Sequence, residues 1–308
     1  MLTRMMTKMI AMAISVTGGM GCTLLNSAEM DAQVEQQFKY KLSVCALFKD
    51  EAKYLREWIE YHRLIGVEHF YLFDNGSGDY SKYVLAPYIR DGIVTLTHWP
   101  DRVPVSDTSR ISHWALSTQL PAYELTAKHL ALEETEWLAL LDVDEYLVPV
   151  EANSMGEVLK EFADYPGLQL TSDFFDASHI DALPRRDLLI ATIELTTEPK
   201  KRIETSLEKI IFKPKEHTTF YWPPYRCNYK NDKQPALMSR KEVRINKYVN
   251  RSYQDNMFNK RKDKLNVDSR QFSERERREL LDIGYELDDA ERAINRFEPL
   301  LRKKLGFR

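Results

Sequence analysis

Two aspartates, Asp142 and Asp144, form the pattern with the clearest chemical use. They follow the apolar run WLALL at 137–141, which is typical of a buried strand, and one valine separates them. Where the chain turns at a strand end, two such carboxylates can face one ligand. Hard divalent cations such as Mg²⁺ and Mn²⁺ bind few carboxylates and complete their shell with phosphate oxygens and water. The pair therefore predicts a metal–diphosphate site; the alternative is an acidic turn without a metal.

Polar side chains also follow two earlier predicted strands, at 42–48 and 67–73. The residues concerned are Lys49, Asp50 and Glu51 after the first strand, and Asp74 and Asn75 after the second. In open α/β sheets, ligands bind beyond the carboxyl ends of the parallel strands. We therefore expect these two groups and the aspartate pair to converge on one face.

Helices are predicted between and after these strands. Residues 53–65 place apolar side chains on one face, and Gly66 closes that helix. Pro121 is expected to interrupt a helix within 111–133, and Ser154 with Glu157 forms a capping box. The other predicted helices are 83–89, 253–262, 273–283 and 288–304, and the other strands are 93–96, 168–175, 208–213 and 243–248. The alternation predicts an α/β fold with a mostly parallel central sheet, flanking helices and a helical C-terminal tail.

Composition narrows the class of protein. The chain has 308 residues, of which 43% are hydrophobic, enough for a buried core. Its 47 acidic and 44 basic residues give a net charge of −3, so charge gives no reason to expect a nucleic-acid partner. The three cysteines are widely spaced, which argues against a disulfide scaffold and against a structural zinc site.

The first 40 residues differ from the rest and are assigned to a separate segment. Arg4 and Lys8 precede an uncharged stretch at 9–28, followed by a polar linker. Three interpretations stay open: a leader that ends at Gly21-Cys22, a weak membrane anchor through 9–28, or a frayed or misassigned start. The protein is accordingly expected to be membrane-associated or exported through this segment, and otherwise cytoplasmic.

Four stretches of the chain resemble glycosyltransferase family 92, whose members are nucleotide-sugar enzymes of the GT-A fold. The resemblance is carried by VCALFKDEAKYLREWIEYHRLIGVEHFYLFDNGSGD at 44–79 and EWLALLDVDEYLVP at 136–149, and more thinly by KIIFKP at 209–214 and VRINKYVNRSYQDNMFNKRKDK at 243–264. It implies a single GT-A-like domain over 41–308. It also implies transfer of a hexose, with galactose as one candidate, from a nucleotide-diphosphate sugar to a glycan or other hydroxyl acceptor, with inversion.

The resemblance implies roles for individual positions. The donor-binding positions are Lys49, Asp50, Glu51, Asp74, Asn75, Gln119 and Lys247, and the ligands of Mn²⁺ or Mg²⁺ are Asp142 and Asp144. The carboxylate of Asp74 can accept both ribose hydroxyls. An inverting reaction needs a carboxylate that deprotonates the acceptor hydroxyl. We assign this role to Asp176, ahead of Asp173, and acceptor binding to His179.

Three positions depart from the family pattern. Asp50 replaces an asparagine, the stretch Phe175-Asp176-Ala177-Ser178-His179 lacks two glycines, and Lys247 stands where members have a histidine. An ammonium cannot ligate a cation, so Lys247 must either turn away or pair with phosphate oxygens, and we expect the second. The alternatives to an active transferase are a catalytically degenerate relative that binds nucleotide sugar or glycan, and a metal-dependent phosphoesterase.

Overall fold

The computed structural model describes residues 38–101, 114–176, 183, 187–192, 208–221, 225–251 and 291–307, which belong to the unit Phe38–Arg308. The predicted leader or anchor and most of the linker fall in Met1–Gln37, which lies outside the described residues. Within the described ranges, no helix combines the length and the apolar character needed to cross a bilayer.

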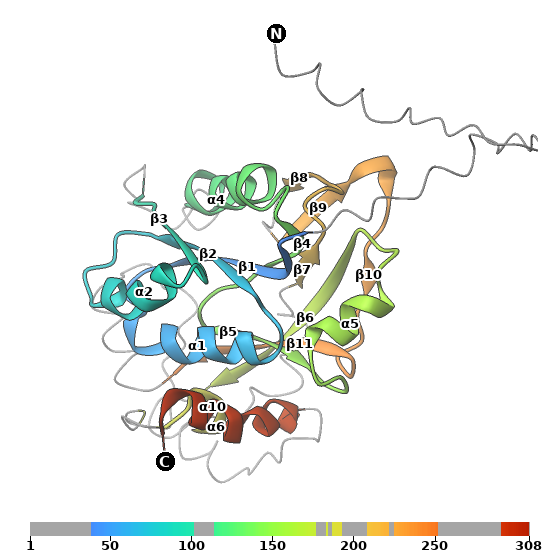
Figure 1. The fold of residues 1–308 in the computed structure, drawn as a ribbon. Helices are drawn as coiled ribbons and strands as arrows, with labels where there is room; N and C mark the ends of the chain where they lie inside the picture. The colour runs from blue at the N-terminus through green and yellow to red at the C-terminus, as the bar shows by residue number, and fades with distance from the viewer. Residues whose placement is uncertain are drawn as a thin grey trace, which may run out of the picture. The chain divides into compact units, whose positions relative to one another are not determined.

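Four parallel strands build the first half of the main sheet (Figure 1). They are β1 (Tyr40–Phe48), β2 (His69–Asp74), β3 (Val94–His98) and β4 (Thr135–Leu140), in the order β3-β2-β1-β4. Their register pairs Phe48 with Asp74 and Cys45 with Leu140. The carboxyl ends of β1, β2 and β4 therefore lie at one edge of the sheet, as predicted.

The second half of the sheet mixes strand directions. The order continues from β4 through β7 (Glu208–Phe212), β6 (Gly167–Asp176) and β11 (Val243–Asn250) to β5 (Glu145–Pro149), and β10 (Ala236–Leu237) pairs with β6. Because β7 is antiparallel to both β4 and β6, these two run in the same direction. β11 is parallel to β6, so both end at the same edge as β4. The sequence did not predict β5, β10 or the hairpin of β8 (His217–Tyr221) and β9 (Arg226–Tyr229).

Alternate side chains of β1 pack on opposite faces of the sheet, as the period of two in a strand requires. Val44 and Ala46 join the core under α1 (Ala52–Leu64), α2 (Ser81–Arg90), α5 (Met155–Glu161) and α10 (Glu298–Leu305). Cys45 and Leu47 join a second core under α4 (Leu120–Leu125). Figure 1 shows α1 and α4 on opposite sides of β1 and β2. The predicted α/β architecture, with its C-terminal helix, is confirmed.

The prediction that Pro121 interrupts a helix is wrong. Residues 115–130 run through a π-helical turn (Ala115–Gln119), α4 and a second π-helical turn (Thr126–Leu130), and the residues at both junctions keep helical backbone angles. Pro121 lies in the first turn of α4, where a missing N–H group is tolerated. The proline therefore coincides with a change of hydrogen-bond register rather than with a break.

Two other local predictions are confirmed at atomic level, the second in part. Gly66, just after α1, has a φ of +105°, a conformation that favours glycine. The Ser154 hydroxyl accepts a hydrogen bond from the Glu157 N–H at 3.3 Å and caps α5, while the Glu157 carboxylate accepts from the Asn153 N–H at 2.9 Å rather than from Ser154 as in a capping box. Of the predicted C-terminal helices, only the last is described, as a 3₁₀ turn (Glu291–Phe297) that leads into α10; 253–262 and 273–283 lie outside the described residues.

Candidate functional site

Three carboxylates gather where β4 turns into β5. Asp142 and Asp144 are joined there by Glu145, and one oxygen from each lies within 4.8 Å of the others. The turn is held by the N–H of Glu145, which donates to the carbonyl of Asp142 at 3.0 Å, and by the N–H of Asp142, which donates to Glu145 Oε2 at 2.9 Å. Glu145 is fully buried, whereas about a quarter of the Asp142 and Asp144 side chains is exposed. We call these three residues the acidic cluster.

The ammonium of Lys247 lies among the three carboxylates. Its Nζ donates to Glu145 Oε1 at 2.9 Å, to Asp142 Oδ2 at 3.2 Å and to Asp144 Oδ1 at 3.4 Å. Lys247 lies opposite Glu145 in the antiparallel register of β11 and β5, so the sheet itself delivers the side chain to the cluster. Lys247 thus does not turn away from the acidic cluster, and its pairing with phosphate oxygens of a donor stays a prediction.

A second lysine, Lys209 on β7, pairs with two carboxylates of the cluster. It is fully buried, and its Nζ lies 2.8 Å from Glu145 Oε2 and 3.3 Å from Asp142 Oδ2. The same Nζ lies 3.3 Å from the centre of the Tyr225 ring, and the Tyr225 hydroxyl donates to Asp142 Oδ2 at 3.3 Å. Gln119 donates to that hydroxyl at 3.2 Å, so this predicted donor residue reaches the cluster through Tyr225.

Burial and opposite charges compete in setting the pKa values of this site. Burial raises the pKa of Asp142, but the neighbouring Lys209 and Lys247 outweigh it, so the pKa lies below its ordinary value. Burial, with the charge of Asp142, raises the pKa of Glu145. Burial would lower the pKa of Lys247, yet the three carboxylates raise it well above its ordinary value. Lys247 is therefore a fixed positive charge.

The three carboxylates are an oxygen set that could hold a divalent ion. The Lys247 ammonium, however, already takes one oxygen from each of them. An ammonium and a metal ion cannot share this position, because like charges repel and the ammonium offers no lone pair. The cluster as it stands does not fit Mn²⁺ or Mg²⁺ unless Lys247 moves away.

The polar residues after β1 hold a turn and an ion pair. Lys49 is exposed, and Asp50 has a φ of 58°. Asp50 Oδ1 accepts hydrogen bonds from the N–H groups of Gly78 at 2.8 Å and Asp79 at 3.1 Å. The Glu51 carboxylate pairs with both terminal nitrogens of Arg251, at 2.6 and 2.7 Å. Because of these contacts, Asp50 and Glu51 have structural roles whether or not they also meet a donor.

The residues after β2 are buried and held in the same way. Asp74 Oδ1 accepts a hydrogen bond from the Ser77 N–H at 2.7 Å, and the side chain is 2% exposed. The Asn75 amide donates to the Trp99 carbonyl at 2.8 Å and to Asp101 Oδ1 at 3.0 Å. We call Asp50 and Asp74, with the backbone of residues 77–79, the capped turn. Its position beside the carboxyl ends of β1 and β2 agrees with the predicted convergence.

The predicted base and acceptor residues are only partly placed. Asp176 is the last residue of β6, at the edge where β4 ends, and its side chain lies outside what the structure describes. His179 also lies outside the described residues. The second candidate, Asp173, is 3% exposed and pairs with Arg240 at 2.7 Å and Arg244 at 3.2 Å. This pairing makes Asp173 a structural residue rather than a free base.

Sequence reasoning missed four residues of the site: Glu145, Lys209, Tyr225 and Arg251. Lys209 gave a usable signal, because it is a lysine at the start of the apolar strand residues Ile210, Ile211 and Phe212. A charged residue in a buried strand needs a partner of opposite charge. Glu145 adjoined the aspartate pair, but nothing local showed that it turns back toward them.

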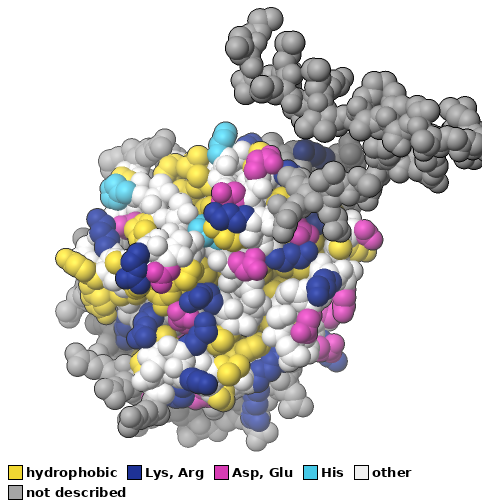
Figure 2. Space-filling view, viewed as in Figure 1, with side chains coloured by type: hydrophobic (Ala, Val, Ile, Leu, Met, Phe, Trp, Pro, Cys, Tyr) yellow, Lys and Arg dark blue, Asp and Glu magenta, His cyan; other side chains and the backbone are white. Residues whose placement is uncertain are grey.

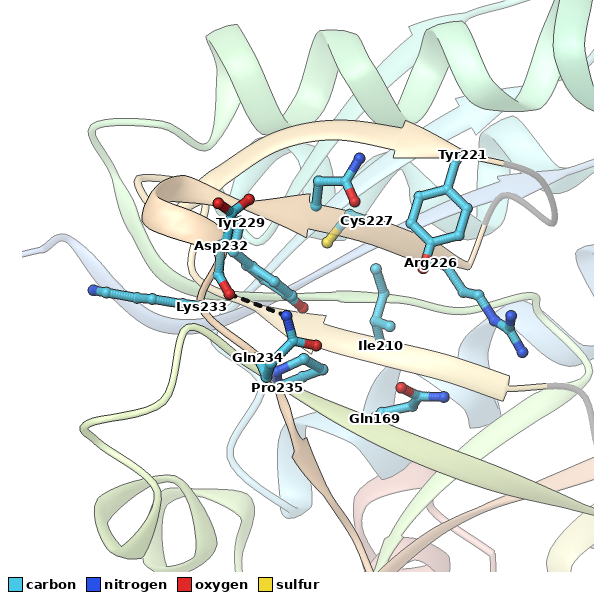
Figure 3. A pocket seen from close by; sticks show the side chains of 11 residues that line it. Gln169, Ile210, Tyr221, Arg226, Cys227, Tyr229, Asp232, Lys233, Gln234 and Pro235 are labelled. Atoms are coloured by element: carbon cyan, nitrogen blue, oxygen red, sulfur yellow. Dashed lines mark hydrogen bonds between the residues drawn. The ribbon is translucent and has the colours of Figure 1, made fainter.

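A separate cavity of about 130 Å³ lies between the β8–β9 hairpin, β6, β7 and residues 232–235, which precede β10 (Figure 3). In Figure 3 the Ile210 side chain lies between Gln169 and the hairpin residues Cys227 and Tyr221, all of which line the cavity. No residue of the acidic cluster lines it. Ligand pockets usually measure about 300–1,000 Å³, so this cavity is too small for a nucleotide sugar.

Comparisons with known proteins cover most of the described unit. The model of glycosyltransferase family 92 matches residues 39–283. A family 92 protein of Oryza sativa subsp. japonica is 28% identical over 130 residues, which are 41% of this chain and 19% of that protein. A family 92 protein of Arabidopsis thaliana is 31% identical over 109 residues, 35% of this chain and 16% of that protein. The aligned part thus spans less than a fifth of each of these two relatives.

Solved structures show more distant likenesses. Staphylococcus aureus TarS 1–349 in complex with UDP-GlcNAc is 11% identical, with a TM-score of 0.41, over 85% of this chain and 74% of that one. Glucosyl-3-phosphoglycerate synthase from Mycobacterium tuberculosis, in complex with Mn²⁺, uridine diphosphate and glucosyl-3-phosphoglycerate, is 14% identical, with a TM-score of 0.31, over 60% and 61%. No residue is carried over from either structure. The match over 39–283, which is most of the sequence, shows that the chain belongs to glycosyltransferase family 92.

Proposed function

We propose that this chain is a glycosyltransferase that uses a nucleotide-diphosphate sugar. It moves a hexose, with galactose as one candidate, to a hydroxyl of a glycan or another acceptor, with inversion. The observation that carries the proposal is the acidic cluster at the carboxyl edge of the sheet, beside the capped turn and inside the region matched by the family model. Ligands of open α/β sheets bind at this edge.

The residues at this edge suit a donor with a charged leaving group. A nucleoside diphosphate gains negative charge as the sugar bond breaks, and a fixed positive charge stabilises it. Burial lowers the pKa of Arg251, but Glu51, with smaller effects of Tyr54 and Asp144, raises it above its ordinary value. Arg251 is paired with Glu51, so the exposed Lys49, which follows β1, is the side chain that we propose to meet the diphosphate. Asp74 and Asn75 are proposed to meet the ribose or the base.

The proposed catalytic base belongs to β6. Asp176 ends this strand two residues after Phe174, which lies opposite Lys247 in the register of β6 and β11, and this register supports Asp176 as the proposed base. Acceptor binding by His179 and membrane association through residues 9–28 stay predictions.

Figure 2 shows basic and acidic side chains interspersed over the face in view, so that face offers no large patch of one sign.

One observation favours a second candidate, a degenerate relative that binds nucleotide sugar without turnover. Lys247 occupies the place where a catalytic cation would lie, so the cluster is neutralised from within. Binding without transfer would identify this second candidate.

Isothermal titration of the full chain with uridine-diphosphate glucose, galactose and N-acetylglucosamine, followed by turnover assays with sugar acceptors, tests the proposal. We expect one donor to bind and to be consumed. Asp144→Asn should change the affinity for that donor, because it removes a part-exposed charge from the cluster that the donor is proposed to meet. Asp91→Asn is the matched control, since Asp91 is half-exposed and pairs with Arg90 away from the cluster. Absence of binding for every donor would refute both candidates.

A further inference from the structure

We propose that the ammonium of Lys247 is the resident cation of the acidic cluster. In this view the chain holds no divalent ion there, and removal of the ammonium converts Asp142, Asp144 and Glu145 into a divalent-cation site. The inference goes beyond the proposed function, because it concerns the cluster alone and holds whether or not a sugar is transferred.

The hydrogen-bonding capacity of Lys247 is matched by the cluster. An ammonium has three N–H donors and no acceptor. Lys247 Nζ lies 2.9 to 3.4 Å from one oxygen of each of the three carboxylates. Three oxygens from three residues, gathered within 4.8 Å, are also what a hard divalent ion would use. The ammonium therefore occupies the position that the ion would need.

The backbone fixes this arrangement. Lys247 faces Glu145 across the β11–β5 pair, and its neighbours Asn246 and Tyr248 are fully buried. The Lys247 side chain is 13% exposed. The side chain comes from a strand that lies between β5 and β6 and pairs with both. Displacing it would leave an ammonium without its partners in a largely buried place, which is costly.

Lys209 is a second ammonium in contact with the cluster, and it also opposes binding of a divalent ion. It is fully buried and pairs with Glu145 at 2.8 Å and with Asp142 at 3.3 Å. A divalent ion in the cluster would therefore meet a second fixed positive charge even if Lys247 moved. With Lys247 removed, Lys209 would balance only one of the three negative charges, and the excess would still attract a cation.

The consequence for a donor rests on the proposed function. If a nucleotide sugar binds at this edge, its binding should not require a divalent ion. Chelator should then leave the affinity of the wild-type chain for uridine diphosphate unchanged within about twofold, a difference of less than half a kcal/mol.

Mn²⁺ titration of the full chain without nucleotide, by calorimetry and by electron paramagnetic resonance, tests the inference directly. Wild type should show no saturable Mn²⁺ site with a dissociation constant below about 1 mM. Lys247→His and Lys247→Ala should each bind one Mn²⁺ about a hundredfold more tightly than this limit. Lys233→Ala is the matched control, because it removes a lysine from an exposed pair with Glu216. Asp142→Asn added to Lys247→His should abolish the new site.

Two results would overturn the inference. One is a micromolar Mn²⁺ site in wild type that Asp142→Asn removes. The other is a folded Lys247 variant, verified by circular dichroism, that gains no site. If neither Lys247 variant folds, the wild-type titration with its Asp142→Asn partner still decides. Failure of every donor to bind would refute the proposed function and leave the Mn²⁺ comparison intact.

Discussion

Two acidic regions lie at the same edge of the sheet, and the protein neutralises them in different ways. In the capped turn, Asp50 and Asp74 accept hydrogen bonds from backbone N–H groups. In the acidic cluster, the carboxylates pair with the ammonium groups of Lys209 and Lys247. The first solution uses dipoles that every residue carries, and the second uses full charges brought from distant strands.

The difference predicts how each region tolerates mutation. An amide oxygen can replace a carboxylate oxygen that only accepts from a backbone N–H, so asparagine should suffice in the capped turn. A buried ammonium needs the negative charge itself, since loss of one partner leaves an uncompensated charge in the interior. Removal of charge should therefore be severe in the acidic cluster and mild in the capped turn.

The largest effect is expected for Glu145→Ala. This change takes from the buried Lys209 the carboxylate at 2.8 Å and from Lys247 its nearest partner. Breaking a buried pair costs about 3–5 kcal/mol, and we expect a loss of that size in the free energy of unfolding. Urea denaturation at pH 7 measures it.

The double variant Glu145→Leu with Lys209→Met controls for charge. It replaces the pair by apolar side chains and should recover much of the loss, because no buried charge is left alone. A loss below about 1 kcal/mol for Glu145→Ala would show that Asp142 by itself satisfies Lys209, and that the two regions differ less than we infer.

The same contrast explains what the sequence could and could not predict. The convergence of the strand ends after Phe48, Asp74 and Leu141 was predictable, because parallel neighbouring strands end at one edge. The Asp74 contact to Ser77 is local, and a DNGS run favours such a turn. The lysine partners of Asp142 lie 67 and 105 residues away, on strands whose pairing the sequence does not specify. The sequence therefore predicted that the two aspartates face one site, but it did not predict the lysines that neutralise them.

The second prediction concerns acid. The pKa of Asp142 lies below its ordinary value of 3.8, because Lys209 and Lys247 outweigh the effect of burial. A depressed carboxyl pKa contributes stability above the unfolded value, and this contribution is lost as the pH falls toward the folded value. Asp142→Asn should therefore cost about 2 kcal/mol at pH 7 and progressively less below pH 4.

Urea midpoints of wild type and Asp142→Asn at a series of pH values measure this difference, in which the carboxyl groups outside the acidic cluster cancel. Asp79→Asn, a change in the contacts of the capped turn, is the comparison variant, since Asp79 accepts from the N–H groups of Ala52 and Ser81. A cost of Asp142→Asn that stays constant from pH 7 to pH 3 would contradict the ion pairing.

The third prediction separates charge from backbone shape at Asp50. Asp50→Ala should cost about 1–2 kcal/mol, because two backbone N–H groups lose their acceptor. Its φ of 58° suits aspartate, asparagine and glycine better than alanine. Asp50→Asn, which keeps both the acceptor and the backbone preference, should stay within about 0.5 kcal/mol of wild type. Thermal unfolding of the two variants compares them, and equal losses would show that the charge of Asp50 matters after all.

The smallest effect on stability is expected for Asp74→Asn, and this variant separates the turn from the proposed ligand. Asparagine can still accept the Ser77 N–H in the same local turn, so the free energy of unfolding should change by less than about 0.5 kcal/mol. If Asp74 also accepts the ribose hydroxyls of the proposed donor, the lost charge should weaken uridine-diphosphate binding about tenfold. Titration with uridine diphosphate and its 2′-deoxy analogue sharpens the result. Wild type should prefer the ribose form, and Asp74→Asn should lose that preference, whereas a purely structural Asp74 would leave both affinities unchanged.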